Sequence, residues 1–87
     1  MGYEVLLHPG VSKYLLKLAR DAPKDAKRCV HGLRELAKNP LKTRPGVDIA
    51  PWKGEEFSHR LRVGRHRFGY RVDKRAKLIY VDAAWFK

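Results

Sequence analysis

The spacing of the apolar residues changes once along this chain of 87 residues, and that change constrains the fold more than any other feature. Between residues 9 and 38 the apolar residues recur every three or four positions, which is typical of helices with one buried face. From Phe57 onward they alternate with polar residues, which is typical of strands. We therefore expect an α+β fold in which a sheet packs on helices.

Two prolines divide the helical part. Pro9 and Pro23 each suit the first turn of a helix, where the missing N–H would have no partner. The second helix should end at Asn39, because the residue before a proline is pushed out of the helical region. The sequence thus predicts two antiparallel helices with a very short link, preceded by a short strand in "YEVLLH", residues 3–8.

The second half is predicted to form an antiparallel meander. Residues 40–56 are rich in proline and are expected to be a loop, with at most a short strand at "VDI". Three strands should follow, at about residues 57–63, 66–72 and 77–83. The length suits one domain, so we expect residues 1–87 to form a single unit.

The densest positive charge lies in "HRLRVGRHRFGYRV", residues 59–72. Gly64 and Arg65 make a two-residue turn, a length that favours the primed turn types. Such a turn places Arg62 opposite Arg67 and leaves a hollow at Gly69, opposite Arg60. Cross-strand partners share a face, so one face carries arginines and the other carries the apolar residues. The exposed set is predicted to be Arg60, Arg62, Arg67 and Arg71. Tyr80 joins it from the next strand, which is expected to pair through a turn at Lys74-Arg75.

This arginine-rich face favours an anionic ligand. Like charges opposite each other destabilise a sheet, so a purely structural hairpin would mix its signs. The planar fork of arginine binds phosphate through two hydrogen bonds and stacks on bases. The net charge of +11 points to an anionic partner, which could be nucleic acid, a ribosome, an acidic protein or a membrane surface. A solvated basic surface without a ligand stays the alternative, and Tyr80 is equally compatible with base stacking and with filling a gap.

Other kinds of site are not indicated. His59 and His66 fall on the core side, and no His, Cys, Asp and Glu set has metal-ligand spacing, so we expect no metal and no cofactor. The single cysteine, Cys29, is expected in the core and suits a reducing compartment. No apolar run is long enough to span a membrane, and we expect a cytoplasmic protein. Trp52 and Trp85 lie in or near loops, where each could equally well cover the fold as a structural lid or stack on a nucleobase as a base platform.

The order of elements and several motifs resemble the RelE/ParE superfamily of toxin–antitoxin toxins, and most closely its archaeal RelE-type members. The motifs are "HPGVSKYLLKL" at the first helix, "LRELAKNPLKTRPGVDI" after the second, "WKG" in the loop, and "RLRVGRHRFGYRV" in the hairpin. The resemblance covers essentially the whole chain.

The resemblance implies an mRNA endonuclease that acts in the ribosomal A site without a metal ion. The ribose 2′-hydroxyl would attack its own 3′-phosphate, and the basic residues Arg60, Arg62 and Arg67 would be catalytic by orienting and stabilising that phosphate. The expected RNA-binding residues are Lys53, Arg65, Arg71, Tyr80 and Lys87. The implied partners are a cognate, acidic, RelB-like antitoxin, the ribosome and mRNA.

One departure from the family leaves two other functions open. Family members usually continue past the last strand with an arginine and a tyrosine, whereas this sequence has "AWFK", in which Lys87 stands near the place of the arginine. The unmatched tyrosine favours an inactive member that only binds an antitoxin or RNA. A ParE-type inhibitor of DNA gyrase is the other alternative, but it would need no phosphate site, so the arginine face favours the ribonuclease.

Overall fold

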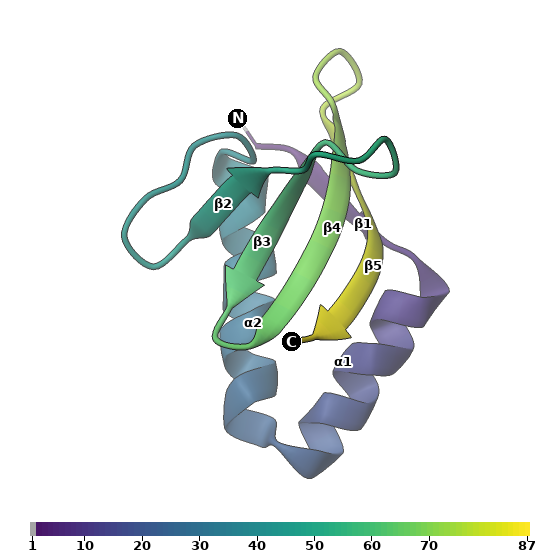
Figure 1. The fold of residues 1–87 in the computed structure, drawn as a ribbon, viewed down its shortest axis with the longest axis vertical. Coiled ribbons are helices and arrows are strands. Elements are labelled where there is room, and N and C mark those ends of the chain that lie inside the picture. The colour runs from purple at the N-terminus through teal and green to yellow at the C-terminus, as the bar shows by residue number, and fades with distance from the viewer. Residues whose placement is uncertain (1) are drawn as a thin grey trace.

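The computed structural model describes residues 2–87 and consists of two helices packed against one five-stranded sheet (Figure 1). The elements in chain order are β1 (Glu4–Leu7), α1 (Pro9–Asp21), α2 (Pro23–Lys38), β2 (Asp48–Pro51), β3 (His59–Val63), β4 (His66–Asp73) and β5 (Leu78–Phe86). The strand order is β1-β5-β4-β3-β2. β1 runs parallel to β5, and all other neighbours are antiparallel. The expected α+β fold is confirmed.

The helical hairpin has the predicted boundaries. Each helix begins at its proline, and only Ala22 separates them. The side chain of His8 caps α1, because its Nδ1 accepts a hydrogen bond of 3.0 Å from the Gly10 amide. α2 ends at Lys38, and Asn39 before the proline is extended as expected. None of the helices within residues 2–87 is long and apolar enough to cross a membrane.

The hydrophobic core lies between the helices and the inner face of the sheet. Its fully buried members include Val11, Cys29, Leu36, Leu61, Phe68, Tyr70, Ile79 and Val81. Burial raises the pKa of the Cys29 thiol to about 11, so this residue stays neutral and packs as an apolar side chain, as predicted. The Tyr70 hydroxyl donates to the Pro40 carbonyl at 2.6 Å and ties the core to the loop after α2.

His66 is a buried polar residue of the inner face, which confirms its assignment to the core side. The Tyr14 hydroxyl from α1 lies 2.7 Å from its Nδ1, and the Asp25 carboxylate from α2 lies 3.0 Å from its Nε2. A single imidazole therefore joins both helices to β4. Both of its nitrogens have partners, as buried polar groups require.

The β3–β4 hairpin has the predicted register. Arg62 faces Arg67, Arg60 faces Gly69, and Gly64 takes a positive φ of 61° in the turn. The fold positions the arginines of both strands on the side of the sheet that faces away from the helices.

The turn before β5 differs from the prediction. It spans four residues, 74–77, rather than two, and the Ala76 amide donates to the Asp73 carboxylate at 2.9 Å within it. The longer turn shifts the pairing by an even number of residues. Ile79 and Val81 therefore still face the core, and Tyr80 still faces outward, opposite Arg71.

Several strands also have bounds that differ from those expected. β1 is shorter than predicted, at Glu4–Leu7, and β3 begins at His59 rather than at Phe57, so Phe57 lies in the loop before it. The short strand near "VDI" exists as β2 but lies one residue later and reaches Pro51. β5 continues to Phe86, three residues beyond its predicted end. This extension places Trp85 in the sheet, directly opposite Arg67.

Candidate nucleic-acid interface

The outer side of β3, β4 and β5 carries the candidate interface, which we call the arginine face. It is formed by Arg60, Arg62, Arg67, Arg71 and Tyr80, five of the residues that the sequence pointed to. Strand alternation puts their neighbours Leu61, Phe68 and Tyr70 into the core on the opposite side. The same alternation that builds the core therefore collects the positive charges on one surface.

Asp48 neutralises part of this surface. It lies in β2 opposite Arg62, and its carboxylate receives Arg62 Nε at 2.8 Å and Arg60 Nη1 at 3.1 Å. Partial burial alone would raise the pKa of Asp48, but its hydrogen bond to Arg60 and the charges of both arginines outweigh that effect and lower the pKa. Asp48 thus stays ionised and orients the two guanidinium groups. The expectation that the face carries one sign of charge is wrong at this point.

Arg71 also has an acidic partner. A β-bulge between Gly69 and Tyr70 leaves Asp82 as the extra residue of β5. The Asp82 carboxylate receives Arg71 Nε at 2.6 Å and Nη2 at 3.2 Å, and this hydrogen bonding raises the pKa of Arg71. The guanidinium also lies 4.8 Å from the centre of the Tyr80 ring. Arg71 and Tyr80 therefore form a fixed pair.

Arg67 differs from the other arginines of the face. Within residues 2–87 it has no carboxylate partner, and its Nη1 donates to the Gly64 carbonyl at 3.0 Å. Partial burial lowers the pKa of Arg67, and the nearby charges of Arg62 and Arg60 lower it further. An anion bound here would relieve that repulsion, so Arg67 is the strongest candidate for a phosphate ligand.

An aromatic cluster occupies the same face beside Arg67. It consists of Trp52, Phe57 and Trp85. The Phe57 and Trp85 rings are stacked, 5.9 Å apart with an angle of 18°, and Trp52 meets them edge-on at 5.4 and 5.5 Å. The predicted hollow at Gly69 is absent, because the Phe57 ring fills it. A Cβ atom at Gly69 would lie 2.4 Å from that ring.

The remaining predicted residues are spread more widely. Arg65, in the hairpin turn, donates from Nε to the Lys87 carbonyl at 2.8 Å and packs its guanidinium 5.0 Å from the centre of the Phe86 ring. The Lys87 amide in turn donates to the Arg65 carbonyl at 2.9 Å. Lys53 is exposed in the β2–β3 loop, next to Trp52. The structure thus brings the three proposed catalytic arginines together and leaves these three basic residues at the margins.

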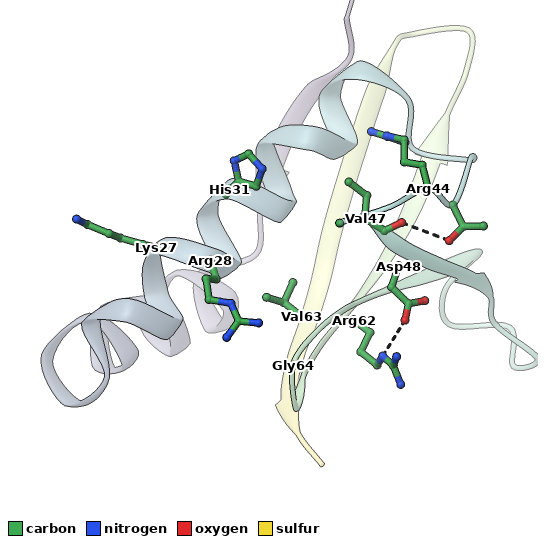
Figure 2. A pocket seen from close by; sticks show the side chains of 11 residues that line it. Lys27, Arg28, His31, Arg44, Val47, Asp48, Arg62, Val63 and Gly64 are labelled. Carbon is green, nitrogen blue, oxygen red and sulfur yellow. Dashed lines mark hydrogen bonds and ion pairs between the residues drawn. The ribbon is translucent and has the colours of Figure 1, made fainter.

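A basic groove adjoins the arginine face, and sequence reasoning missed it. It lies between α2 and the β2–β3 edge of the sheet and encloses about 830 Å³ (Figure 2). Lys27, Arg28 and His31 line it from α2, while Arg62, paired with Asp48, lies on the opposite side. Lys27 and His31 are four residues apart, so helical periodicity alone could have shown that they share a face.

Arg44 also lines this groove, but its role is structural. Its guanidinium donates to three carbonyl groups, those of Glu35, Asn39 and Lys42, at 2.7 to 2.9 Å. These bonds close the end of α2 and fix the loop that leads to β2. Within residues 2–87 no group of three or more His, Cys, Asp or Glu side chains could hold a metal ion.

Comparison with known proteins identifies solved structures of the same shape. No protein-family profile and no curated protein matches the chain. A chain of the archaeal RelE–RelB complex from Pyrococcus horikoshii OT3 matches with a TM-score of 0.80 and 25% identity, covering 99% of this chain and 96% of that one. A chain of the toxin–antitoxin complex RelBE2 from Mycobacterium tuberculosis matches with a TM-score of 0.79 and 20% identity over the full length of both. The YoeB/ParE toxin from Agrobacterium tumefaciens matches with a TM-score of 0.77 and 17% identity, covering 97% of this chain and 98% of that one.

Proposed function

Because the chain has the fold of the RelE/ParE toxins, as its sequence motifs indicated, we propose that it is the toxin of a toxin–antitoxin pair and cleaves mRNA on the ribosome. The observation that carries this proposal is the position of Arg67. It stands beside Arg60 and Arg62 with a lowered pKa and without a carboxylate partner in the described chain. Such a site has more to gain from a phosphate than an ordinary surface arginine has.

The proposed reaction needs no metal ion. The ribose 2′-oxygen attacks the adjacent phosphorus, the bond from phosphorus to the 5′-oxygen breaks, and a 2′,3′-cyclic phosphate and a 5′-hydroxyl result. The proton of the 2′-hydroxyl leaves to water, and the departing 5′-oxygen takes a proton from water. Arginine stays protonated at neutral pH and is therefore no general base. Arg67 instead stabilises the charge that gathers on the phosphate oxygens, which is an electrostatic form of catalysis.

Arg60 and Arg62 position the same phosphate. Asp48 holds both guanidinium groups on one side, which leaves their remaining N–H donors for the ligand. A site whose donors are already oriented loses little free energy to reorganisation when the transition state forms. In this proposal Asp48 is a positioning residue, and the three arginines are catalytic.

The flanking residues bind the rest of the RNA strand. Arg71 and Tyr80 offer a guanidinium and a ring on the same face. Arg65 and Lys87 lie at the hairpin turn, and Lys53 lies in the β2–β3 loop. The basic groove extends the positive surface from Arg62 to α2. Together these residues supply phosphate contacts away from the cleaved bond.

A cytoplasmic antitoxin is the proposed partner, and the helical hairpin offers it a surface. Leu16 in α1 is 68% exposed, and it lies in an apolar groove between α1 and α2. Lys27 and Arg34 lie along that groove. An acidic amphipathic helix would complement both the apolar floor and the basic rim. The two complexes matched above each pair a RelE-type chain with a RelB-type antitoxin.

Sequencing of RNA ends after induced expression in a host without the antitoxin tests this function. We expect growth arrest and new 5′-hydroxyl ends within translated reading frames, both suppressed by co-expression of the antitoxin. Gyrase-dependent DNA breaks without new RNA ends would instead show a gyrase inhibitor. Unimpaired growth with neither kind of break would leave only a binding protein and would overturn the proposal.

A further inference from the structure

We propose that the aromatic cluster of Trp52, Phe57 and Trp85 is a nucleobase-binding platform, on which an unpaired base of the RNA stacks while its phosphate contacts Arg67. This inference rests on the proposed function, since it specifies how that site recognises its substrate. It assigns Trp52 and Trp85 to base stacking, one of the two roles that their sequence positions left open, and adds Phe57. It also names single-stranded RNA as the form that binds.

The first support is the position of Trp85. It is the direct cross-strand partner of Arg67 on the outer side of the sheet. Such partners have Cβ atoms about 5 Å apart, so both side chains reach the same nucleotide. On the other side of the cluster, Arg60 lies opposite Gly69, over which Phe57 packs. The rings are therefore flanked by two of the proposed phosphate ligands.

The second support is that the rings are held in place before any ligand binds. Phe57 sits on Gly69 and stacks on Trp85, so its own position depends on a residue without a side chain. The Trp52 indole N–H donates to the Glu56 carboxylate, and the Trp52 amide donates to the Ser58 carbonyl at 3.1 Å. In Figure 1 the β2–β3 loop that carries Trp52 and Phe57 crosses over β4. A fixed ring costs less conformational entropy on binding than a mobile one.

The third support is the exposure of the rings. All three side chains are only half-buried, and none belongs to the main hydrophobic core. Aromatic rings between arginines are the combination that binds single strands, because every base has a face for stacking and every nucleotide has a phosphate. Bases in a duplex have both faces covered, so this platform selects unpaired RNA. The alternative is that the cluster only fastens the β2–β3 loop to the sheet.

Intrinsic fluorescence distinguishes these alternatives, because both tryptophans of the chain lie in the cluster. The purified full chain is titrated with a short single-stranded 2′-O-methyl RNA, which cannot undergo 2′-hydroxyl attack. The matched control is an oligomer of the same length and charge whose central nucleotides are abasic. We expect quenching of tryptophan emission by the first oligomer only, and binding at least about tenfold tighter than that of the abasic oligomer.

Substitutions of the tryptophans test whether the tighter binding of the base-containing RNA depends on their rings. Trp85→Leu keeps an apolar side chain but removes the aromatic face, and should weaken binding of the base-containing RNA about tenfold without changing the affinity for the abasic oligomer. Trp85→Phe keeps a ring and should weaken binding less than Trp85→Leu does. Thermal melting shows whether each variant folds. If Trp85→Leu does not fold, Trp52→Leu replaces it in the same titrations.

The outcomes separate this inference from the proposed function. Equal affinity for both oligomers, with no quenching, would overturn the platform while leaving phosphate binding by the arginines intact. Binding of neither oligomer would contradict the proposed RNA site itself. An equal loss of affinity for both oligomers in Trp85→Leu would show that the cluster acts only by holding the loop.

Discussion

Arg67 differs from the neighbouring arginines of the arginine face, because it has no carboxylate partner within residues 2–87 and they do. Asp48 binds Arg60 and Arg62, and Asp82 binds Arg71. Each of these ion pairs is partly exposed, so each adds little to the stability of the fold. Their more important effect is to orient the guanidinium groups. Arg67 has only carbonyl partners and carries the charge that a ligand would neutralise.

The first prediction is that Arg62→Ala and Arg67→Ala each abolish toxicity and leave the fold intact. Loss of one donor to the transition state should slow cleavage by about a hundredfold to a thousandfold. Both side chains point away from the core, so the free energy of unfolding should change by no more than about 0.5 kcal/mol. The checks are growth after induction and urea denaturation.

Arg75→Ala is the matched control for these variants. Arg75 is an exposed arginine in the turn between β4 and β5, away from Arg67. Its removal lowers the net charge by the same amount and should leave toxicity unchanged. Full toxicity of Arg67→Ala, or unfolding of that variant, would contradict the assignment of the face.

The second prediction is that Asp48→Asn changes RNA binding and RNA cleavage in opposite directions. Removing this carboxylate should tighten RNA binding at low salt, because one negative charge near the phosphate disappears. Cleavage should nevertheless slow, because Arg60 and Arg62 lose the group that orients them. Fluorescence titration and cleavage rates measure the two effects. Faster cleavage together with tighter binding would show that Asp48 has no positioning role.

The pH dependence of the free energy of unfolding tests whether the pKa of Asp48 is lowered in the folded protein. The pKa of Asp48 is lowered below its usual 3.8 in the folded protein, so its contribution is present above that pH and disappears as the pH falls through the lowered value. The loss of stability below about pH 4 should therefore be smaller in Asp48→Asn than in the wild type. Identical acid denaturation curves would contradict this shift.

The arginines of the hairpin could be placed from the sequence, whereas their acidic partners could not. Alternation and a two-residue turn were enough to place Arg60, Arg62 and Arg67 on one face, because both rules act within a hairpin. Asp48 and Asp82 could not be placed in that way. Asp48 reaches the face through the pairing of β2 with β3, and Asp82 reaches it through a bulge. Neither depends on residues adjacent in the sequence.

The elements differ in how far local signals determined them. The helices were predicted to within a residue, because proline at each start and Asn39-Pro40 at the end fix their limits. The β2–β3 loop carries no such signal for its position. It folds over the sheet because the Phe57 ring packs on Gly69, the one residue of β4 that has no side chain. This tertiary contact brings the two tryptophans together and was not predictable from spacing.

The third prediction concerns that contact. Gly69→Ala would place a methyl group 2.4 Å from the Phe57 ring, so the loop must move. We expect a loss of stability of about 1–3 kcal/mol, the usual range for overpacking, and a change in tryptophan emission. In a Phe57→Ala background the same substitution should cost much less, because the ring is gone. Equal costs in both backgrounds, measured by urea denaturation, would show that the contact is absent.

The whole molecule combines a small core with a net charge of +11. The positive surface continues from the arginine face through Arg62 into the basic groove on α2. The first strand joins this sheet at its far edge, parallel to β5. The sequence indicated that strand but not its neighbour, since a pairing across more than 70 residues is set by overall packing and not by a turn.

The fourth prediction follows from the extended positive surface. Binding of single-stranded RNA should weaken steeply with salt, by about 0.7 log units per log unit of salt for each phosphate contacted. Arg67→Ala should lower the slope by about one contact, and the double variant Lys27→Ala/Arg28→Ala tests whether the basic groove contributes as well. A flat salt dependence would mean that the basic surface does not contact phosphate.

Cleavage of a defined mRNA by the purified chain on ribosomes is the decisive test of the proposed ribonuclease activity. Ribosomes are halted with a known codon in the A site, the chain is added, and the new RNA ends are mapped for the wild type and for Arg67→Ala. We predict a single cut within that codon, leaving a 5′-hydroxyl end, in the wild type, and a rate at least about a hundredfold lower in Arg67→Ala. Absence of a cut with the wild type would contradict the proposed ribonuclease activity, and equal cleavage by both proteins would contradict the catalytic role of Arg67.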